Sequence, residues 1–388
     1  MRYLFALLLP LSLAPGGCTT WPDRIPRLEA QAEAARLPNF ESVRYWADAP
    51  PATYAAMRDE IATSAPERQA DTLLALSGGA DDGAYAAGFL KGWSDSRERP
   101  QFSIVSGVST GALIAPFAFL GSEYDKNLRA FYTEISRKDI YRQRGIVGLL
   151  TQPSVADSAP LAELIAANID EAILDAIAIE HGSGRRLLVQ TTNLDAGRGV
   201  IWDMGAIAQS NDPRRLELFR RVLLASASVP GLFAPVMIEV SDGAKSFAEM
   251  HVDGAVTAGF LAVTETMAIS GGLRPEVEQD RIFIILNGRL RPRYETVGAS
   301  TFSIVERALD TVLSAYDRAN LVNAQLFAAN NNVDLAITYI GPDFDVETEE
   351  LFSQPYMNAL YEHGAEHGAE RGRTGAWYGS LDQTLEGQ

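Results

Sequence analysis

The hydrophobic pattern of the chain changes near residue 71. From there on, short apolar runs of strand length alternate with longer segments in which apolar residues recur at helical spacing. Strands separated by helices favour parallel pairing, so we expect an α/β fold, a mainly parallel sheet sandwiched between helices in three layers. No long repeat or break in composition divides residues 71–388, which are predicted to form one domain with a helical C-terminal part. The predicted strands are residues 72–76, 102–106, 186–192, 200–203, 235–240, 282–287 and 334–340.

Two long helices are predicted from their apolar stripes. The first covers residues 159–180 and the second covers residues 301–330. A stripe of this kind is more often part of the core than a lipid-binding surface, so we expect both to face inward. The stripe residues are Leu161, Leu164, Ile165, Ile169, Ile173 and Ile177 in the first helix, and Val305, Leu309, Val312, Leu313 and Tyr316 in the second.

The N-terminal residues have the pattern of a signal peptide. Arg2 precedes an apolar run at residues 4–13 that is far shorter than a membrane span, and small residues follow it. Residues 1–17 are therefore predicted to be a signal peptide. Residues 18–70 are rich in alanine, proline and charge, and are predicted to be an anchor tether and N-terminal extension. A short helix is expected at residues 27–36, and the rest is expected to pack loosely on the domain.

Cys18 is the only cysteine, so the chain cannot form an intramolecular disulfide. Its position after the apolar run resembles a bacterial lipoprotein signal, which is cleaved before a cysteine that is then acylated. Pro15 departs from the usual residues of that signal, so an ordinary secretory signal is the alternative. The lipoprotein interpretation implies lipid attachment at Cys18 in the cell envelope, and Thr19 at the next position fits the periplasmic side of the outer membrane.

The formal net charge of −17 limits the possible partners. Nucleic acid is excluded, because phosphate contacts need a basic surface. Adsorption to anionic lipid by charge alone is disfavoured for the same reason. A lipid substrate would therefore have to be reached through apolar contacts or through an anchor.

Residues 107–111 read Gly-Val-Ser-Thr-Gly and lie between a predicted strand and an apolar helical segment that begins at Ala112. This context is typical of a nucleophile elbow, a sharp turn with small flanking residues that exposes a serine hydroxyl at a helix N-terminus. Ser109 is therefore a candidate nucleophile.

Two other turns carry candidate groups. Residues 77–88 are rich in glycine and follow the strand 72–76, so they form either an anion-binding nest of N–H groups or only a tight strand-to-helix turn. Phosphate binding is disfavoured, because the loop holds two aspartates and no Gly-Lys-Ser/Thr follows. Residues 253–255, Asp-Gly-Ala, offer either a catalytic carboxylate or a common Asp-Gly turn.

In this order, the glycine-rich loop, the Gly-x-Ser-x-Gly turn and the Asp-Gly-Ala turn resemble the patatin-like phospholipase family. Residues 189–198 and 225–235 resemble two further blocks of that family, so the resemblance spans roughly residues 73–287. It implies a serine lipid acyl hydrolase of the phospholipase A or esterase type. Such an enzyme acts on phospholipid or another acyl ester and needs no metal or other cofactor.

The resemblance also implies the role of each site residue. Ser109 corresponds to the nucleophile and Asp253 to the general base of a Ser–Asp dyad. The backbone N–H groups of Gly78, Gly79 and Ala80 correspond to the oxyanion hole, which stabilises the charge that develops on the substrate carbonyl oxygen.

The glycine-rich loop departs from the family pattern at two positions. Ala80 stands where the family has a third glycine, and Asp82 stands where it has an arginine. A carboxylate aimed at the oxyanion hole would oppose catalysis, so we expect Asp82 to point outward; the alternative is that it binds a cation or a substrate hydroxyl. The departure leaves open an alternative function, a catalytically weak or silent envelope lipoprotein that binds lipid in the same pocket.

Three of the four histidines lie in suggestive places. His251 precedes Asp253 by two residues and is either a third catalytic group or, more often at such a position, a structural histidine. His363 and His367 complete a His-x-x-Glu-His motif that binds zinc in some enzymes. Here the motif lies in a glycine-containing tandem repeat without a suitable third ligand downstream, which favours a polar C-terminal helix and no metal site.

Overall fold

The computed structural model describes residues 24, 28–50, 52–53, 59, 63–64, 72–143, 154–262, 280–291, 294, 296–348 and 350–380. Within them no helix is both long and apolar enough to cross a membrane. The helices are α1 (Glu29–Ala34), α3 (Gly83–Asp95), α4 (Thr110–Leu120), α5 (Asp125–Thr133), α6 (Arg137–Ile140), α8 (Ala159–Asn168), α9 (Glu171–Gly182), α10 (Met204–Gln209), α11 (Arg215–Ser226), α13 (Thr301–Asn331) and α14 (Gln354–Thr374), with short 3-10 turns η1 (Ala80–Asp82), η2 (Ser122–Tyr124) and η3 (Gly254–Val256). The strands are β1 (Arg44–Trp46), β2 (Thr72–Leu76), β3 (Ile104–Val108), β4 (Arg142–Gln143), β5 (Ala156–Asp157), β6 (Arg186–Asn193), β7 (Arg198–Asp203), β8 (Val236–Ser241), β9 (Ser246–Asp253), β10 (Arg281–Leu286) and β11 (Asp334–Tyr339).

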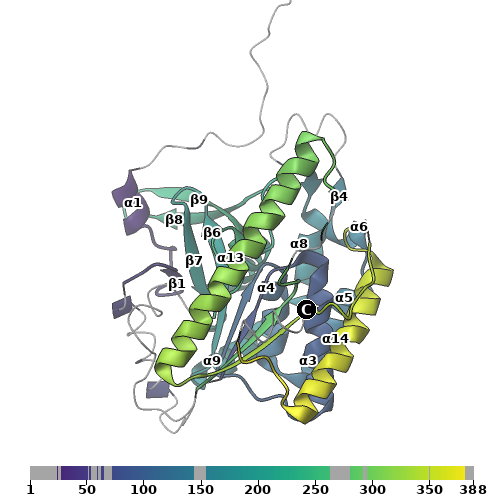
Figure 1. Cartoon of the computed structure of the whole chain (residues 1–388). Coiled ribbons are helices and arrows are strands. Elements are labelled where there is room, and N and C mark those ends of the chain that lie inside the picture. Colours follow the sequence, from purple (N-terminus) through teal and green to yellow (C-terminus); the bar gives the residue numbers. More distant parts are fainter. Residues whose placement is uncertain are drawn as a thin grey trace, which may run out of the picture.

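Nine of the described strands form one mixed sheet (Figure 1). Its main path runs β1-β7-β6-β3-β2-β10-β11, and the strands from β6 to β11 are parallel. At the other end β1 and β7 are antiparallel, and the β8–β9 hairpin joins β6 in antiparallel register. The predicted mainly parallel sheet is confirmed, while β9, which ends at Asp253, was not among the predicted strands.

The two faces of the sheet are covered by different helices. Successive residues of a strand point to opposite faces, so Leu74 and Leu76 join the core formed with α3, α4, α9, α11 and α14. Leu73 and Ala75 join a second core that α13 covers. Figure 1 shows α13 crossing one face of the sheet, with α3 and α14 to its side. The predicted three-layer arrangement of helices around a sheet is thus confirmed.

The long predicted helix is α13, but its stripe is only partly buried. The prediction that Val312, Leu313 and Tyr316 face inward is wrong, because they are 64%, 36% and 37% exposed. They border an open pocket instead of packed core. The side chains of Val305 and Leu309 lie outside the described part of the chain. The C-terminal half of the helix packs on the sheet through Leu321, Ala324 and Phe327.

The other predicted helix is two helices, α8 and α9. The break falls at Asp170, because its carboxylate accepts a hydrogen bond from the N–H of Ile173 and caps the N-terminus of α9. The predicted inward stripe holds across the break, and Ile165, Ile169 and Ile177 are all at most 2% exposed.

Residues 28–50 are built into the domain. The prediction of loose packing is wrong for this segment: β1 adds to the sheet edge beside β7, while Leu37, Phe40 and Val43 lie in the core. The Arg44 guanidinium also contacts the buried Glu249 carboxylate at 2.5 Å. The composition of the segment, which is polar and rich in proline, did not indicate these few buried apolar residues, because composition is an average over the whole segment.

Glycines allow α3 and α14 to pack backbone against backbone. A Cβ on Gly88 or Gly92 of α3 would lie 1.9 Å from a carbonyl oxygen of α14. A Cβ on Gly364 or Gly368 of α14 would lie 2.3 or 2.0 Å from a carbonyl oxygen of α3. The glycine-containing repeat therefore gives the predicted polar C-terminal helix, α14, one buried face.

Candidate active site

Ser109 lies on a strained turn between β3 and α4. Its φ of 55° and ψ of −124° place a non-glycine residue in a conformation that L-amino acids rarely adopt. The glycines on either side are sterically required. A Cβ on Gly107 would meet the Gly111 carbonyl oxygen at 2.3 Å, and one on Gly111 would meet the Leu76 carbonyl oxygen at 2.3 Å. The Gly-x-Ser-x-Gly pattern is thus the local requirement of this turn.

Asp253 lies against Ser109 although 144 residues separate them. The Ser109 hydroxyl donates to Asp253 Oδ2 at 2.7 Å, and the N–H of Ala255 donates to Oδ1 at 2.8 Å. The antiparallel pairing of β9 with β6 sets Asp253 opposite Thr191, near the carboxyl end of β6. Both side chains are buried, so this is a carboxylate held in a dry site with a hydroxyl as its direct partner.

Burial raises the pKa of Asp253 to about 7, and the hydrogen bonds from Ser109 and Ala255 oppose the shift. A carboxyl with a pKa near neutrality is a stronger base than an exposed aspartate, and it exchanges protons readily at that pH. The geometry and the basicity therefore both suit proton transfer from Ser109.

The glycine-rich loop lies directly beside Ser109. A Cβ on Gly78 would be 3.1 Å from Ser109 Cβ, and a Cβ on Gly79 would meet the Asn287 carbonyl oxygen at 1.9 Å. The N–H of Gly78 donates to the Gly259 carbonyl at 2.9 Å, so it is engaged in this structure. Within the described part of the chain, the N–H groups of Gly79 and Ala80 have no acceptor. Of the three predicted oxyanion-hole donors, these two are available.

Ala80 has a φ of 50°, in the left-handed region that glycine adopts without strain. This is the position where the patatin-like pattern has its third glycine. The backbone conformation of the loop is thus kept by an alanine at a modest energetic cost.

Asp81 and Asp82 tie the loop to the C-terminal region. The Tyr356 hydroxyl of α14 donates to Asp82 Oδ1 at 2.6 Å, and the N–H of Phe352 donates to Asp81 Oδ2 at 2.9 Å. Asp82 therefore has a hydrogen-bond partner on α14 that is distant in sequence, which agrees with the outward orientation.

Two residues that support the site were not singled out from the sequence. The Ser226 hydroxyl accepts from the N–H of Ser109 at 3.0 Å and donates to the Gln190 carbonyl at 2.7 Å. Asn287 bridges to Ser77 through its own N–H and its side-chain amide, each at 2.8 Å. Ser226 falls within the block at residues 225–235, which was the only signal that could have pointed to it.

His251 does not contact the dyad. It is fully buried, with Nδ1 2.9 Å from the Thr191 hydroxyl and Nε2 3.3 Å from the Glu249 carboxylate. Burial lowers the pKa of His251. Burial alone would raise the pKa of Glu249, but hydrogen bonds from His251 and Arg44 bring it to about 2. Both ring nitrogens are thus used within a structural network, which fits the structural interpretation of this histidine.

An open pocket of about 480 Å³ lies beside Ala255, two residues from Asp253, although neither Ser109 nor Asp253 lines it. Ala255 belongs to its wall and also donates its N–H to Asp253, so the pocket reaches the catalytic turn. The pocket combines apolar side chains of α13 with the polar side chains of Gln190 on β6 and of Thr257, which follows η3. Its lining includes Gln190, Val256, Thr257, Val312, Leu313 and Tyr316.

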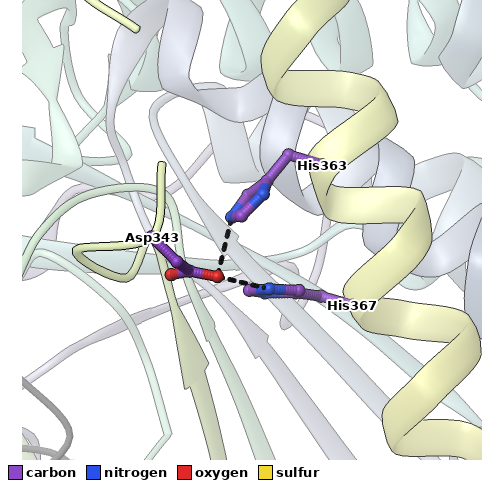
Figure 2. A group of neighbouring side chains, drawn as sticks. All are labelled: Asp343, His363 and His367. Atoms are coloured by element: carbon purple, nitrogen blue, oxygen red, sulfur yellow. Dashed lines mark hydrogen bonds and ion pairs between the residues drawn. The ribbon is translucent and has the colours of Figure 1, made fainter. Parts of the chain in front are cut away.

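The sequence raised two other candidate sites, Cys18 and the pair of histidines at positions 363 and 367. Cys18 is outside the described residues. His363 and His367 lie together on α14, and the loop after β11 brings Asp343 against them (Figure 2). Asp343 precedes the motif by 20 residues in the chain and is therefore not among the downstream ligands considered from the sequence.

Comparison with known proteins finds one matching family, and two similar solved structures are described below. Residues 74–263 match the family described as patatin-like phospholipase. VipD from Legionella pneumophila is similar in structure with a TM-score of 0.39 and 13% identity, covering 78% of this chain and 66% of VipD. The type III effector protein ExoU is similar with a TM-score of 0.31 and 12% identity, covering 82% of this chain and 57% of ExoU. The matched regions are thus less than two thirds of either effector. No curated protein matches the chain.

The family match covers the nucleophile elbow, the glycine-rich loop and the turn that carries Asp253. It agrees with the mainly parallel sheet and its helical layers. Residues 74–263 therefore form a patatin-like phospholipase domain.

Proposed function

We propose that the protein is a serine lipid acyl hydrolase that uses Ser109 and Asp253 as a catalytic dyad. The observation that carries the proposal is the 2.7 Å hydrogen bond between a buried serine on a strained elbow and a buried aspartate whose pKa is near 7. No histidine among the described residues contacts either group. The aspartate therefore serves as the only base within hydrogen-bond distance of the hydroxyl.

The reaction has two stages. Asp253 takes the Ser109 proton as Oγ attacks the acyl carbonyl, and it then gives that proton to the departing alcohol. Water, deprotonated by the same carboxylate, attacks the acyl-enzyme. Asp253 then returns this proton to Ser109 Oγ as the ester bond breaks and the fatty acid leaves. The N–H groups of Gly79 and Ala80 stabilise the oxyanion in both stages, and Gly78 keeps the loop against Ser109.

The pocket beside Ala255 is proposed to receive the acyl chain. Val312, Leu313 and Tyr316 are exposed along its α13 side and supply the apolar contacts that a fatty acyl chain needs. The substrate is thus phospholipid or another long-chain acyl ester. Replacing Leu313 by Trp would narrow the pocket and lower kcat/KM for long acyl chains more than for acetyl or butyryl esters.

We further propose that the protein is attached to the cell envelope through an acylated Cys18, on the periplasmic side of the outer membrane. This rests on the sequence of residues 1–19 alone. Fractionation of cells that express the wild type or Cys18→Ser tests it, with loss of the variant from the membrane fraction as the expected result.

Covalent labelling tests the catalytic proposal directly. A fluorophosphonate probe should label the wild type at Ser109 and leave Ser109→Ala unlabelled. A wild-type protein that resists the probe and hydrolyses no ester in a panel of phospholipids and p-nitrophenyl esters would instead favour the silent lipid-binding alternative.

A further inference from the structure

Three metal-ligating side chains converge on one point beside α14. Asp343 Oδ2 lies 2.8 Å from His367 Nε2 and 3.8 Å from His363 Nε2, and the ligand atoms of all three residues lie within 4.8 Å of one another (Figure 2). In zinc sites the metal–nitrogen and metal–oxygen distances are about 2.0–2.2 Å, which separates tetrahedral ligands by about 3.3 Å. The measured separations bracket that value.

One ligand atom of this cluster is left without a hydrogen bond. His363 Nε2 is buried and has no hydrogen bond within the described structure, although it is directed at Asp343. A buried ring nitrogen without a partner is costly, since a typical buried polar atom is paired. A cation between the two imidazoles and the carboxylate would satisfy it.

The other histidine, His367, is oriented by a contact to its second ring nitrogen, Nδ1. The Tyr85 hydroxyl lies 3.4 Å from His367 Nδ1 and 2.7 Å from the Thr338 hydroxyl, in the buried interface between α3 and β11. If Tyr85 accepts from Nδ1–H and donates to Thr338, the lone pair of His367 is on Nε2, which faces Asp343. Outer hydrogen bonds of this kind are the usual way in which metal-binding histidines are fixed.

The backbone explains why the two rings lie together. His363 and His367 are one turn apart, so their side chains share one side of α14. Gly364 and Gly368, one residue further, press that helix against α3. The four-residue repeat thus places a row of close-packing glycines next to a row of histidines, and the ring centroids are 4.1 Å apart.

We propose that Asp343, His363 and His367 bind a divalent transition-metal ion of the zinc class. Two imidazoles and one carboxylate suit such an ion better than Mg²⁺ or Ca²⁺, which prefer oxygen ligands. Asp343 is half exposed, so a water molecule completes the coordination. Glu366, the acidic residue of the sequence motif, is exposed and is not part of the site.

The ion would act as a structural clamp. It joins α14 to the loop after β11, two strands from the loop beside Ser109. The N-terminal turn of α14 already holds that loop through Tyr356 and Asp82. This inference is independent of the proposed hydrolase activity, because its tests measure metal binding and stability.

Metal binding to the full-length chain tests the site. The protein is prepared as Cys18→Ser without a histidine tag, so that no thiol or tag competes, and is stripped with EDTA. Calorimetry with Zn²⁺ should give one site per chain. Zn²⁺ at about a hundredfold excess over its dissociation constant should raise the thermal unfolding midpoint by about 3–6 °C, whereas Mg²⁺ and Ca²⁺ should not. Co²⁺ should give the visible absorption bands of a four-coordinate site.

Matched variants assign the ligands. His363→Gln and His367→Gln should abolish the Zn²⁺-dependent rise in the unfolding midpoint, and Asp343→Asn should weaken binding by about 10–100-fold, whereas Glu366→Gln on the same helix should bind as the wild type does. Circular dichroism without metal checks that each variant folds. The proposal is overturned if the wild type shows no Zn²⁺ binding at millimolar metal, if the histidine variants bind unchanged, or if Glu366→Gln removes binding. The wild-type result stands even if a variant fails to fold.

Discussion

The Ser109–Asp253 pair and the Asp343–His363–His367 cluster both lie at the carboxyl ends of the parallel strands, yet they are organised in different ways. Ser109 is held by a strained backbone and by glycines that no larger residue can replace. Its partner is buried in a dry site that penalises charge. The three cluster residues lie on unstrained backbone and are partly exposed, with one nitrogen unpaired.

This difference indicates what holds the functional groups of each region in place. At the dyad, folding itself fixes the reacting atoms, and the protein tolerates strain and a buried carboxyl to do so. At the cluster, folding brings the ligands close and leaves the last step to an ion. The first region should therefore respond to mutation mainly in rate, and the second mainly in stability.

Ser109→Ala should cause the largest effect. Loss of the nucleophile should lower ester hydrolysis by at least about 10³-fold, because no other activated hydroxyl is proposed. The folded structure should be unchanged by circular dichroism. EDTA treatment of the wild type should leave the rate at 25 °C within about twofold, since the proposed mechanism uses no metal. Substantial turnover of p-nitrophenyl butyrate by Ser109→Ala would break the distinction between the two regions.

Asp253→Asn should lower kcat by at least about 10³-fold, because an amide cannot accept the serine proton. His251→Gln is the matched control, a buried position two residues away that contacts Thr191 and Glu249 but not the dyad. Its activity per folded molecule should stay within about threefold of the wild type. An inactive, folded His251→Gln together with an active Asp253→Asn would identify a histidine base instead.

The pH dependence of rate and stability should run in opposite directions. Asp253 is the base only when ionised, so kcat/KM should fall as the pH is lowered through about 7. A folded pKa above the unfolded value means that the native state binds the proton more tightly. This contribution to stability is therefore complete below about pH 4 and is lost as the pH rises through about 7.

Asp253→Asn removes that loss, so at pH 8 the variant should be more stable than the wild type by on the order of 1–4 kcal/mol, with no gain near pH 3. Urea unfolding at the two pH values measures the difference. Equal stability of the two proteins at pH 8 would show that the carboxylate is not desolvated.

Asp82→Asn should have the smallest effect. Burial and the Asp82 carboxylate raise the pKa of Tyr356, and the variant weakens the hydrogen bond between them. We expect a loss of about 1 kcal/mol in unfolding free energy and no rise in kcat. Tyr356→Phe should cost a similar amount, and the double variant should cost less than the sum. A clear increase in kcat for Asp82→Asn would mean that the carboxylate does oppose the oxyanion.

The sequence alone was sufficient for the features that depend on local geometry. The alternation of apolar runs predicted the parallel sheet and its helices, and the glycine spacing predicted the elbow at Ser109. These patterns can be recognised in the sequence because each depends on a few neighbouring residues. Strands and helices have short side-chain periods, and a positive φ favours a small residue at one position. The roles of Ser109, Asp253 and the loop came from the order of three such turns, and they stay predictions until tested.

The tertiary structure decided which distant groups meet. Only pairing with β6 brings Asp253 to Ser109, and only the loop after β11 brings Asp343 to the two histidines. The tertiary structure also decided that the Gly78 N–H donates to the Gly259 carbonyl, and that one face of α13 is exposed at the pocket. Such contacts join residues far apart in the chain, and no local period encodes them, because they are set by how whole elements pack.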